Sequence, residues 1–198
     1  MNLPNKLTLS RFGLTVAFLV VMFSGMPLYE TIALALFVAA GISDFLDGQI
    51  ARRRNLITNF GILMDPLADK IMVCSAFIAF VELGWFPAWM TVIIVARELA
   101  ITGLRLLAAS KNVVLAAEGY GKHKTISQIV AVIAIFVERI IAKDQWGTIG
   151  NMIFGWHIGA HAWVWWLAES FKWISVALTF ISGSLYLWKN RALYLNDM

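Results

Sequence analysis

Long apolar segments alternate with short polar connections along the 198-residue chain. An α-helix needs about 17–25 mostly apolar residues to cross a bilayer, and Gly–Pro clusters at residues 25–27 and 84–87 mark breaks between such segments. The pattern therefore predicts an all-α integral membrane protein with six transmembrane helices. Their expected ranges are Leu9–Gly25, Thr31–Asp47, Gly61–Leu83, Trp89–Ala109, Ile126–Ala142 and Trp173–Lys189.

Lysine and arginine side chains gather in alternate connections between these helices. With the N-terminus inside, the inner connections hold most of the cations and the outer ones hold mainly acids. Because cytoplasmic loops carry an excess of Lys and Arg, we expect a multi-pass protein of the cytoplasmic (inner) membrane with both termini in the cytoplasm. The inner cations are Lys6, Arg52, Arg53, Arg54, Lys111, Lys122, Lys124, Lys189 and Arg191, and the outer acids are Glu30, Glu82, Asp144 and Glu169.

A tryptophan-rich segment, residues 146–172, lies between the last two predicted helices. Tryptophan favours the boundary between membrane and water, so this segment is expected to form a helix along the outer surface. His157 and His161, four residues apart, could bind a metal ion on such a helix. We favour histidines that face lipid headgroups, because no cysteine or acidic partner lies nearby. The tryptophans are Trp146, Trp156, Trp163, Trp165 and Trp166.

Composition supports the membrane class and excludes others. Hydrophobic residues make up 60% and charged residues 14% of the chain, against about 45–50% and about 25% in soluble globular proteins. A soluble monomer could not cover so much apolar surface. The single cysteine, Cys74, excludes a disulfide framework within the chain. The net charge of +4 is modest and scattered, so membrane lipids rather than nucleic acid are the expected partners. The length predicts a single domain over residues 1–198.

Two pairs of aspartates stand at the inner ends of the second and third predicted helices. Asp44 and Asp47 are three residues apart, and Asp65 and Asp69 are four apart, so each pair shares one helix face. The short connection between the helices returns the second pair to the depth of the first. We therefore expect the four carboxylates to converge in a polar cavity that faces the cytoplasm.

Four like charges at this depth repel one another unless cations neutralise them. Carboxylate oxygens suit hard divalent ions, Mg²⁺ or Mn²⁺, and carboxylates shared between two ions make a two-metal site. The alternative is that the aspartates pair with nearby side chains of this chain. The candidates for that pairing are Arg52, Arg53, Arg54 and Lys70.

Small and basic residues between the aspartates indicate a phosphate ligand. Gly48 and Gly61 allow a ligand to approach the backbone, and Ala51 leaves the same face uncrowded. Arg52 follows Gly48 by four residues, so its guanidinium can bind phosphate oxygens on that face. The site is therefore interpreted as metal ions with a pyrophosphate.

The segment from Asp44 to Asp69 resembles the signature of the CDP-alcohol phosphotransferase family, DxxDGxxAR-x8-GxxxDxxxD, at every defining position. The resemblance implies six transmembrane helices, two divalent cations on the four aspartates and a CDP-lipid donor. It also implies that Asp69 is the general base that deprotonates the acceptor hydroxyl, and it suggests a homodimer. The donor-binding positions that it implies are Asn5, Thr8, Gly48, Ala51, Arg52, Thr58 and Gly61. From the residues alone, Asn5 and Thr8 could equally belong to a helix cap.

A second set of cations suggests an anionic acceptor, because clustered Lys and Arg bind phosphate well. The expected acceptor-phosphate residues are Arg97, Arg105, Lys122, Lys124 and Thr125. Lys122 and Lys124 could instead serve membrane topology, and Arg97 could pair with Glu98 or Glu118. Together with the Asn5–Arg11 segment, these residues resemble the branch of the family that uses glycerol phosphate. The implied reaction transfers a phosphatidyl group from CDP-diacylglycerol to sn-glycerol 3-phosphate and releases CMP.

Two other functions remain open from the sequence. Within the family, the acceptor could be inositol phosphate, serine or phosphatidylglycerol. In a different class, a transporter could carry a divalent cation through a four-aspartate site. Transporters usually place such sites near the bilayer midplane within internal repeats, whereas the aspartates here stand at helix ends and no repeat is visible.

Overall fold

The structure, a computed structural model, describes residues 3–53, 59–111, 113, 115 and 120–195. For residues 3–7, 45–53, 59–63, 65, 66 and 120–122 it describes the backbone alone.

Six helices of 21 or more residues dominate this described part of the chain, and each contains most or all of one predicted segment. Six long helices thus occur in the predicted order, and that all six cross a membrane stays a prediction. They are α1 (Leu3–Phe23), α2 (Tyr29–Arg53), α3 (Asn59–Glu82), α4 (Ala88–Ser110), α5 (Tyr120–Ala142) and α7 (Trp163–Lys189). The shorter elements are α6 (Gly147–Phe154), β1 (His157–Ile158), β2 (His161–Ala162) and α8 (Ala192–Leu195).

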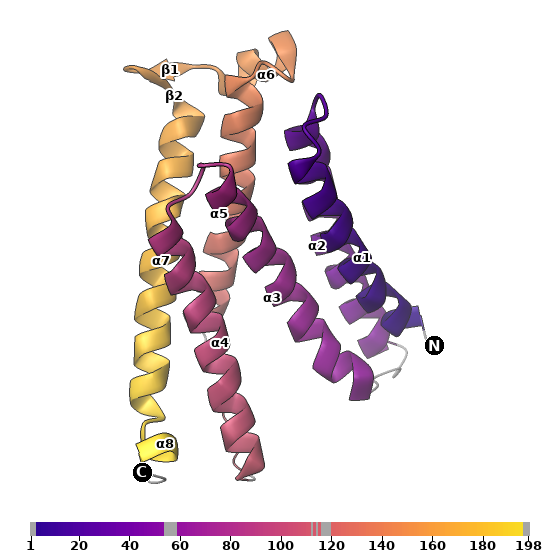
Figure 1. Ribbon diagram of the computed structural model, residues 1–198, viewed down its shortest axis with the longest axis vertical. Helices are drawn as coiled ribbons and strands as arrows, with labels where there is room; N and C mark the ends of the chain where they lie inside the picture. The colour runs from indigo at the N-terminus through magenta and orange to yellow at the C-terminus, as the bar shows by residue number, and fades with distance from the viewer. Residues whose placement is uncertain (1–2, 54–58, 112, 114, 116–119, 196–198) are drawn as a thin grey trace.

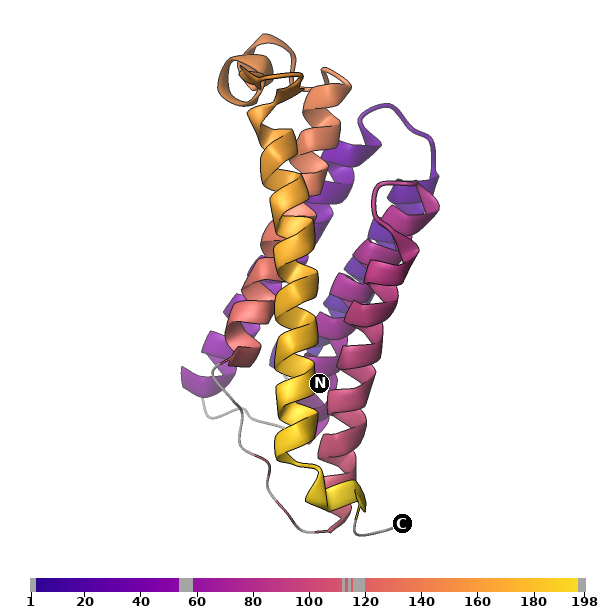
Figure 2. The same cartoon turned by 90° about the vertical axis from the view of Figure 1, so that its left-hand side faces the viewer.

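The long helices run up and down along the longest axis of the molecule (Figure 1). The helix α1 packs against α2 and α3, while α7 packs against α4 and α5. In the view turned by 90°, α7 stands in front and the helices α1, α2 and α3 lie behind the other group (Figure 2). The hairpin of β1 and β2 lies at one end, and both termini lie toward the other (Figure 1). Because successive long helices alternate in direction, the starts of α1, α3 and α5 lie toward the same end of the bundle as the end of α2.

Two helix segments in the described part of the chain are long and apolar enough to cross a membrane, His123–Ala142 of α5 and Trp163–Lys189 of α7. The apolar segment Thr8–Phe23 of α1 is shorter. In α4, every stretch of 18 residues includes Arg97, Glu98 and Arg105. These three charges distinguish α4 from the apolar segments of α5 and α7, although its length of 23 residues suffices to span a bilayer.

Aromatic side chains form the core in the half of the bundle that is nearer the hairpin. The ring of Phe136 meets those of Phe18 and Phe80 edge to face, with centroids 6.1 and 5.0 Å apart. Trp85 closes the cluster against the same ring at 6.1 Å. Such pairs each add about 0.5–1.5 kcal/mol beyond their burial. This packing joins α1, α3 and α5 tightly at one end and leaves polar groups to the other.

The expected surface helix over residues 146–172 is wrong. The segment consists of α6, the β1–β2 hairpin and the first ten residues of α7. Gly159, at a φ of +68°, makes the tight hairpin turn that a continuous helix would not allow. The last long helix also begins at Trp163 rather than Trp173, and it contains an ion pair between Glu169 and Lys172 one turn apart (3.1 Å).

The two histidines of this segment do not lie one turn apart on a helix. His157 stands in β1 and His161 in β2, where Ile158 pairs with His161. The His161 ring stacks on that of Trp165, with centroids 4.1 Å apart. The helical spacing that favoured a metal-binding pair is therefore replaced by a hairpin in which His161 packs on an aromatic ring.

Candidate active site

Arg11 joins the two described aspartates of the signature. Its side chain is buried on α1, and its Nη1 atom forms ion pairs with Asp44 Oδ1 of α2 and with Asp69 Oδ1 of α3, the latter at 2.6 Å. Both carboxylates are about half exposed, at 41% and 52% of their side-chain surface. Two acids that stand 25 residues apart in the chain therefore converge on one cationic group.

This convergence fits the chemistry of a divalent metal site. Asp44 and Asp69 present oxygen ligands of the kind that Mg²⁺ and Mn²⁺ prefer, and a cationic guanidinium already lies between them. Among the residues whose side chains are described, no group of three or more metal-ligating side chains occurs. Asp47 and Asp65 lie in α2 and α3, but their side chains are outside the described set.

Most of the expected donor residues also lie outside the described side chains. Their backbones place Asn5 on α1, Gly48, Ala51 and Arg52 on α2, and Gly61 on α3. Thr58 lies outside the described residues altogether. Thr8 is described and is buried on α1, one turn before Arg11.

A cavity of about 580 Å³ opens beside this ion pair. Its size falls within the range of small-molecule sites, about 300–1,000 Å³. Its lining includes the apolar side chains of Phe37, Val73 and Ile133 together with charged side chains of both signs. The polar or charged lining residues are Arg11, Asp44, Asp69, Lys70, Glu98, Lys124, Thr125 and Gln128. The cavity therefore combines the two aspartates with part of the expected acceptor set.

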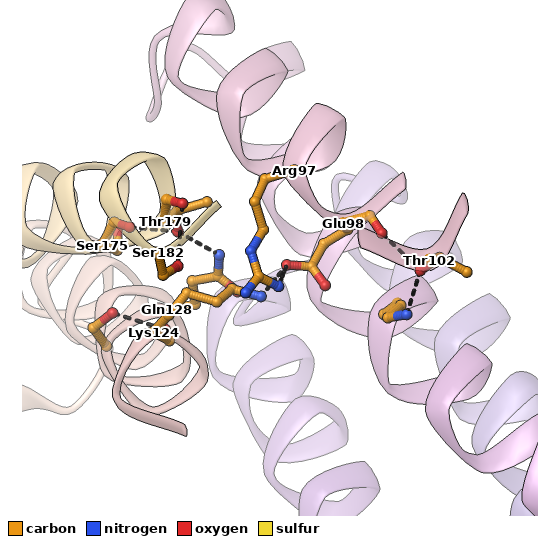
Figure 3. Close-up of polar contacts among 10 residues, drawn as sticks. Arg97, Glu98, Thr102, Lys124, Gln128, Ser175, Thr179 and Ser182 are labelled. Atoms are coloured by element: carbon orange, nitrogen blue, oxygen red, sulfur yellow. Dashed lines mark hydrogen bonds and ion pairs between the residues drawn. The ribbon is translucent and has the colours of Figure 1, made fainter. Parts of the chain in front are cut away.

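Glu98, which also lines the cavity, forms polar contacts with cationic side chains (Figure 3). Its Oε1 atom forms an ion pair with the buried Lys124 of α5 and accepts a hydrogen bond from Arg97 Nη1 at 3.2 Å. On the next turn of α4, Thr102 receives a bond from Lys70 Nζ at 2.5 Å and donates to the Glu98 carbonyl at 2.7 Å. Three cations from three helices thus surround a single acid.

The expected acceptor residues occupy different places. Lys124 and Thr125 line the cavity, and Arg97 reaches its edge through Glu98. Arg105 lies instead against α7, with its guanidinium carbon 6.0 Å from the centre of the Tyr186 ring. The backbone of Lys122 lies in α5, and its side chain is outside the described set.

A close contact with α7 holds Arg97 in place. A Cβ atom on Gly183 would lie 2.7 Å from Arg97 Cγ, so only glycine leaves room for the arginine stem. Gln128 of α5 contacts the same helix, where its Nε2 donates to Thr179 Oγ1 at 2.9 Å. The side chains of α7 thereby support one edge of the cavity.

Arg11 and Glu98 are the site residues that the sequence reasoning did not single out. The alternative to a metal site named Arg52, Arg53, Arg54 and Lys70 as partners of the aspartates, yet Arg11 pairs with both described ones. Its signal was present, because Arg11 is the only charged residue between Lys6 and Glu30. For Glu98, the alternative of a pair with Arg97 is confirmed, and the second pair with Lys124 was not foreseen.

Comparison with known proteins identifies a matching family and several relatives. Residues 1–181 match the family described as CDP-alcohol phosphatidyltransferase. A Bacillus subtilis protein named CDP-diacylglycerol–glycerol-3-phosphate 3-phosphatidyltransferase is 36% identical over 96% of this chain and 95% of its own length. A Rickettsia bellii protein of the same name is 32% identical over 93% of both chains.

A third relative, from Mycobacterium tuberculosis, is named probable phosphatidylglycerophosphate synthase. It is 42% identical over 69% of this chain and 66% of its own length. The family match over residues 1–181 covers the signature aspartates, the residues that line the cavity and nearly all of the helical bundle. The chain therefore belongs to the CDP-alcohol phosphatidyltransferase family.

Proposed function

We propose that this protein is an enzyme that transfers the phosphatidyl group of CDP-diacylglycerol to sn-glycerol 3-phosphate and releases CMP. Relatives that carry this activity in their names match over nearly the whole chain. The observation that carries the proposal is the meeting of Asp44 and Asp69 on one cation, Arg11, in the lining of the cavity. These two residues are the first and last positions of the family signature.

The donor occupies the aspartate side of this cavity. Asp44, Asp47, Asp65 and Asp69 hold two divalent cations, Mg²⁺ or Mn²⁺, which when bound neutralise charge on the pyrophosphate. The donor nucleotide and pyrophosphate bind along α1, α2 and α3. The residues that contact them are Asn5, Thr8, Gly48, Ala51, Arg52, Thr58 and Gly61.

Asp69 acts as the general base. Its carboxylate takes the proton of the acceptor's free primary hydroxyl, because an alcohol near neutral pH needs a base within hydrogen-bond reach. The acceptor oxygen then bonds to the phosphorus that carries the diacylglycerol, and the bond from that phosphorus to CMP breaks. The exposure of half of the Asp69 side chain leaves it accessible from the cavity.

The acceptor phosphate binds on the side of α4 and α5. Lys124 and Thr125 line the cavity there, and Arg97 shares Glu98 with Lys124. Lys70, Arg97 and Lys124 outnumber the single acid among them, so this side of the cavity keeps a net positive charge that favours a phosphate. Arg105 and Lys122 complete the proposed set from positions further out.

The six long helices span the cytoplasmic membrane as a single domain over residues 1–198. Both termini and the cavity face the cytoplasm, and the hairpin faces outward. Two copies of the chain form a homodimer through their membrane helices. The apolar segments of α5 and α7 support a membrane position.

The reaction is tested by mixing the purified protein with CDP-diacylglycerol, Mg²⁺ or Mn²⁺ and candidate acceptors. We expect CMP release with sn-glycerol 3-phosphate, little or none with serine or inositol phosphate, and loss of release when EDTA removes the cations. Release that favours another acceptor would replace the proposed substrate. Absence of CMP with every acceptor would favour the transporter.

A further inference from the structure

We propose that Gln128 binds the secondary hydroxyl of the acceptor, and this inference rests on the proposed function. Gln128 lies on α5, one turn after Lys124, and lines the same cavity. Its side chain is nearly fully buried, with 2% of the residue exposed. An amide at this depth has to satisfy both its nitrogen and its oxygen.

The contact with α7 determines which way the amide points. Thr179 Oγ1 donates its only proton to the Ser175 carbonyl at 2.6 Å, so toward Gln128 it can only accept. Gln128 Nε2 must therefore face Thr179, and it does so at 2.9 Å (Figure 3). The hydrogen-bond network thus orients the amide without ambiguity between its nitrogen and its oxygen.

The Oε1 atom of Gln128 is then left for a ligand. Among the residues that the structure describes, none donates a hydrogen bond to this oxygen, although Gln128 itself lines the cavity. A carbonyl oxygen accepts hydrogen bonds and repels a phosphate, so its natural partner is a hydroxyl. The neighbouring Lys124 carries the charge that a phosphate would bind.

The acceptor sn-glycerol 3-phosphate offers two hydroxyls. Asp69 needs the primary one, and the phosphate faces the cations beside Glu98, so the secondary hydroxyl between them is the group available to Gln128. A site built to hydrogen-bond a substrate hydroxyl discriminates against an analogue that lacks it. Gln128 would thereby help to select glycerol phosphate over simpler phosphorylated alcohols.

The test compares sn-glycerol 3-phosphate with 3-hydroxypropyl phosphate, which lacks only the secondary hydroxyl. In the unchanged enzyme we expect kcat/KM to favour sn-glycerol 3-phosphate by about tenfold or more, the value of one hydrogen bond. Gln128→Leu should reduce this preference to within about threefold, chiefly by raising KM for sn-glycerol 3-phosphate. The KM for CDP-diacylglycerol should stay within about twofold of its original value.

Two further variants separate substrate binding from folding. Thr179→Val leaves Gln128 in place but removes the group that orients its amide, so the preference should fall partway; this variant carries the test if Gln128→Leu does not fold. Ser182→Ala changes a buried hydroxyl of the same helix that bonds only to the Thr179 carbonyl, at 3.2 Å. It should keep the full preference.

An equal loss of activity toward both acceptors in Gln128→Leu would overturn the inference, because a packing defect does not distinguish the two alcohols. A preference that survives the substitution, or is absent from the unchanged enzyme, would also overturn it while the proposed reaction stands. If the unchanged enzyme uses neither acceptor, the proposed function itself fails.

Discussion

At the scale of single residues, the site depends on ion pairs between charged side chains, most of which join different helices. Arg11 pairs with Asp44 and Asp69, and Glu98 pairs with Arg97 and Lys124. Buried ions are costly unless paired, so each charged group in the cavity constrains the position of another. A substitution at one of them is expected to affect its partners as well as its own contact.

Asp69→Asn should lower kcat by at least about 100-fold, because the amide cannot take the acceptor proton. Turnover is measured as CMP release, and folding is checked by size exclusion and thermal melting in detergent. The matched control is Asp144→Asn, an exposed aspartate with a φ of +53°, a conformation that asparagine tolerates well. Substantial turnover by Asp69→Asn would remove this residue from the role of base.

The sequence predicted the acids of the site better than their partners. Spacing within the chain predicted that Asp44 and Asp69 lie on helix faces that meet, and in the structure both contact Arg11. The identity of that partner depends on how α1 packs against α2 and α3. The spacing of residues along the chain carries no information about this packing. The same limit applies to Gln128, whose importance depends on Thr179, 51 residues further along.

At the scale of elements, a polar cluster connects the start of α2 with the end of α5. Glu30 is fully buried and forms an ion pair with Lys143, while Gln145 donates a hydrogen bond to its other oxygen. Burial alone would raise the pKa of Glu30, but the hydrogen bonds from Lys143 and Gln145 outweigh it and hold the pKa below its usual 4.5. The bond to Glu30 likewise raises the pKa of Lys143 above its ordinary value.

Glu30→Gln should destabilise the protein by about 1–3 kcal/mol, because it removes the charge from a buried hydrogen-bonded acceptor. The measurement is the thermal midpoint in detergent at neutral pH. Glu82→Gln is the matched control, since Glu82 is an exposed acid at the same end of the bundle, and it should change stability by less than about 0.5 kcal/mol. Equal midpoints for the two variants would contradict a stabilising role for the cluster.

The ion pair between Glu30 and Lys143 makes the stability of the protein depend on pH, and the pKa shift of Glu30 gives the direction. Because the folded pKa of Glu30 is lowered, its contribution is present above pH 4.5 and disappears as the pH falls through the folded pKa. The difference in thermal midpoint between the unchanged protein and Glu30→Gln should therefore shrink below pH 4.5. A difference that stays constant across this range would separate the effect from the ionisation of Glu30.

At the scale of the whole molecule, the bundle divides into an aromatic half and a polar half. Phe18, Phe80 and Phe136 pack the half nearer the hairpin, and the cavity occupies the other. The sequence predicted six helices because apolar length is a local property. It failed between Trp146 and Trp173, where Gly159 turns the chain in a hairpin and the last long helix begins at Trp163.

Labelling with a membrane-impermeant maleimide tests the proposed orientation. In a Cys74→Ser background, Met152→Cys on α6 should react in intact cells, whereas Ala192→Cys on α8 should react only after permeabilisation. Both positions are exposed in the structure, so a difference in labelling reports the side of the membrane and not burial. The reverse pattern would place the cavity outside, and labelling of both in intact cells would contradict a membrane crossing by α7, the long helix between the two positions.

The charges of α4 bear on the order in which the protein is made. Glu98 finds Lys124 on α5, and Arg97 packs over Gly183 on α7, yet ribosomes deliver α4 before either of these helices exists. On the proposed six-span topology, a nascent chain that ends after α4 holds Glu98 and Arg97 in lipid, where they pair with each other but lack Lys124 and α7, at a cost of several kcal/mol. We therefore expect stable insertion of α4 to be a late event in biogenesis, completed when α7 emerges.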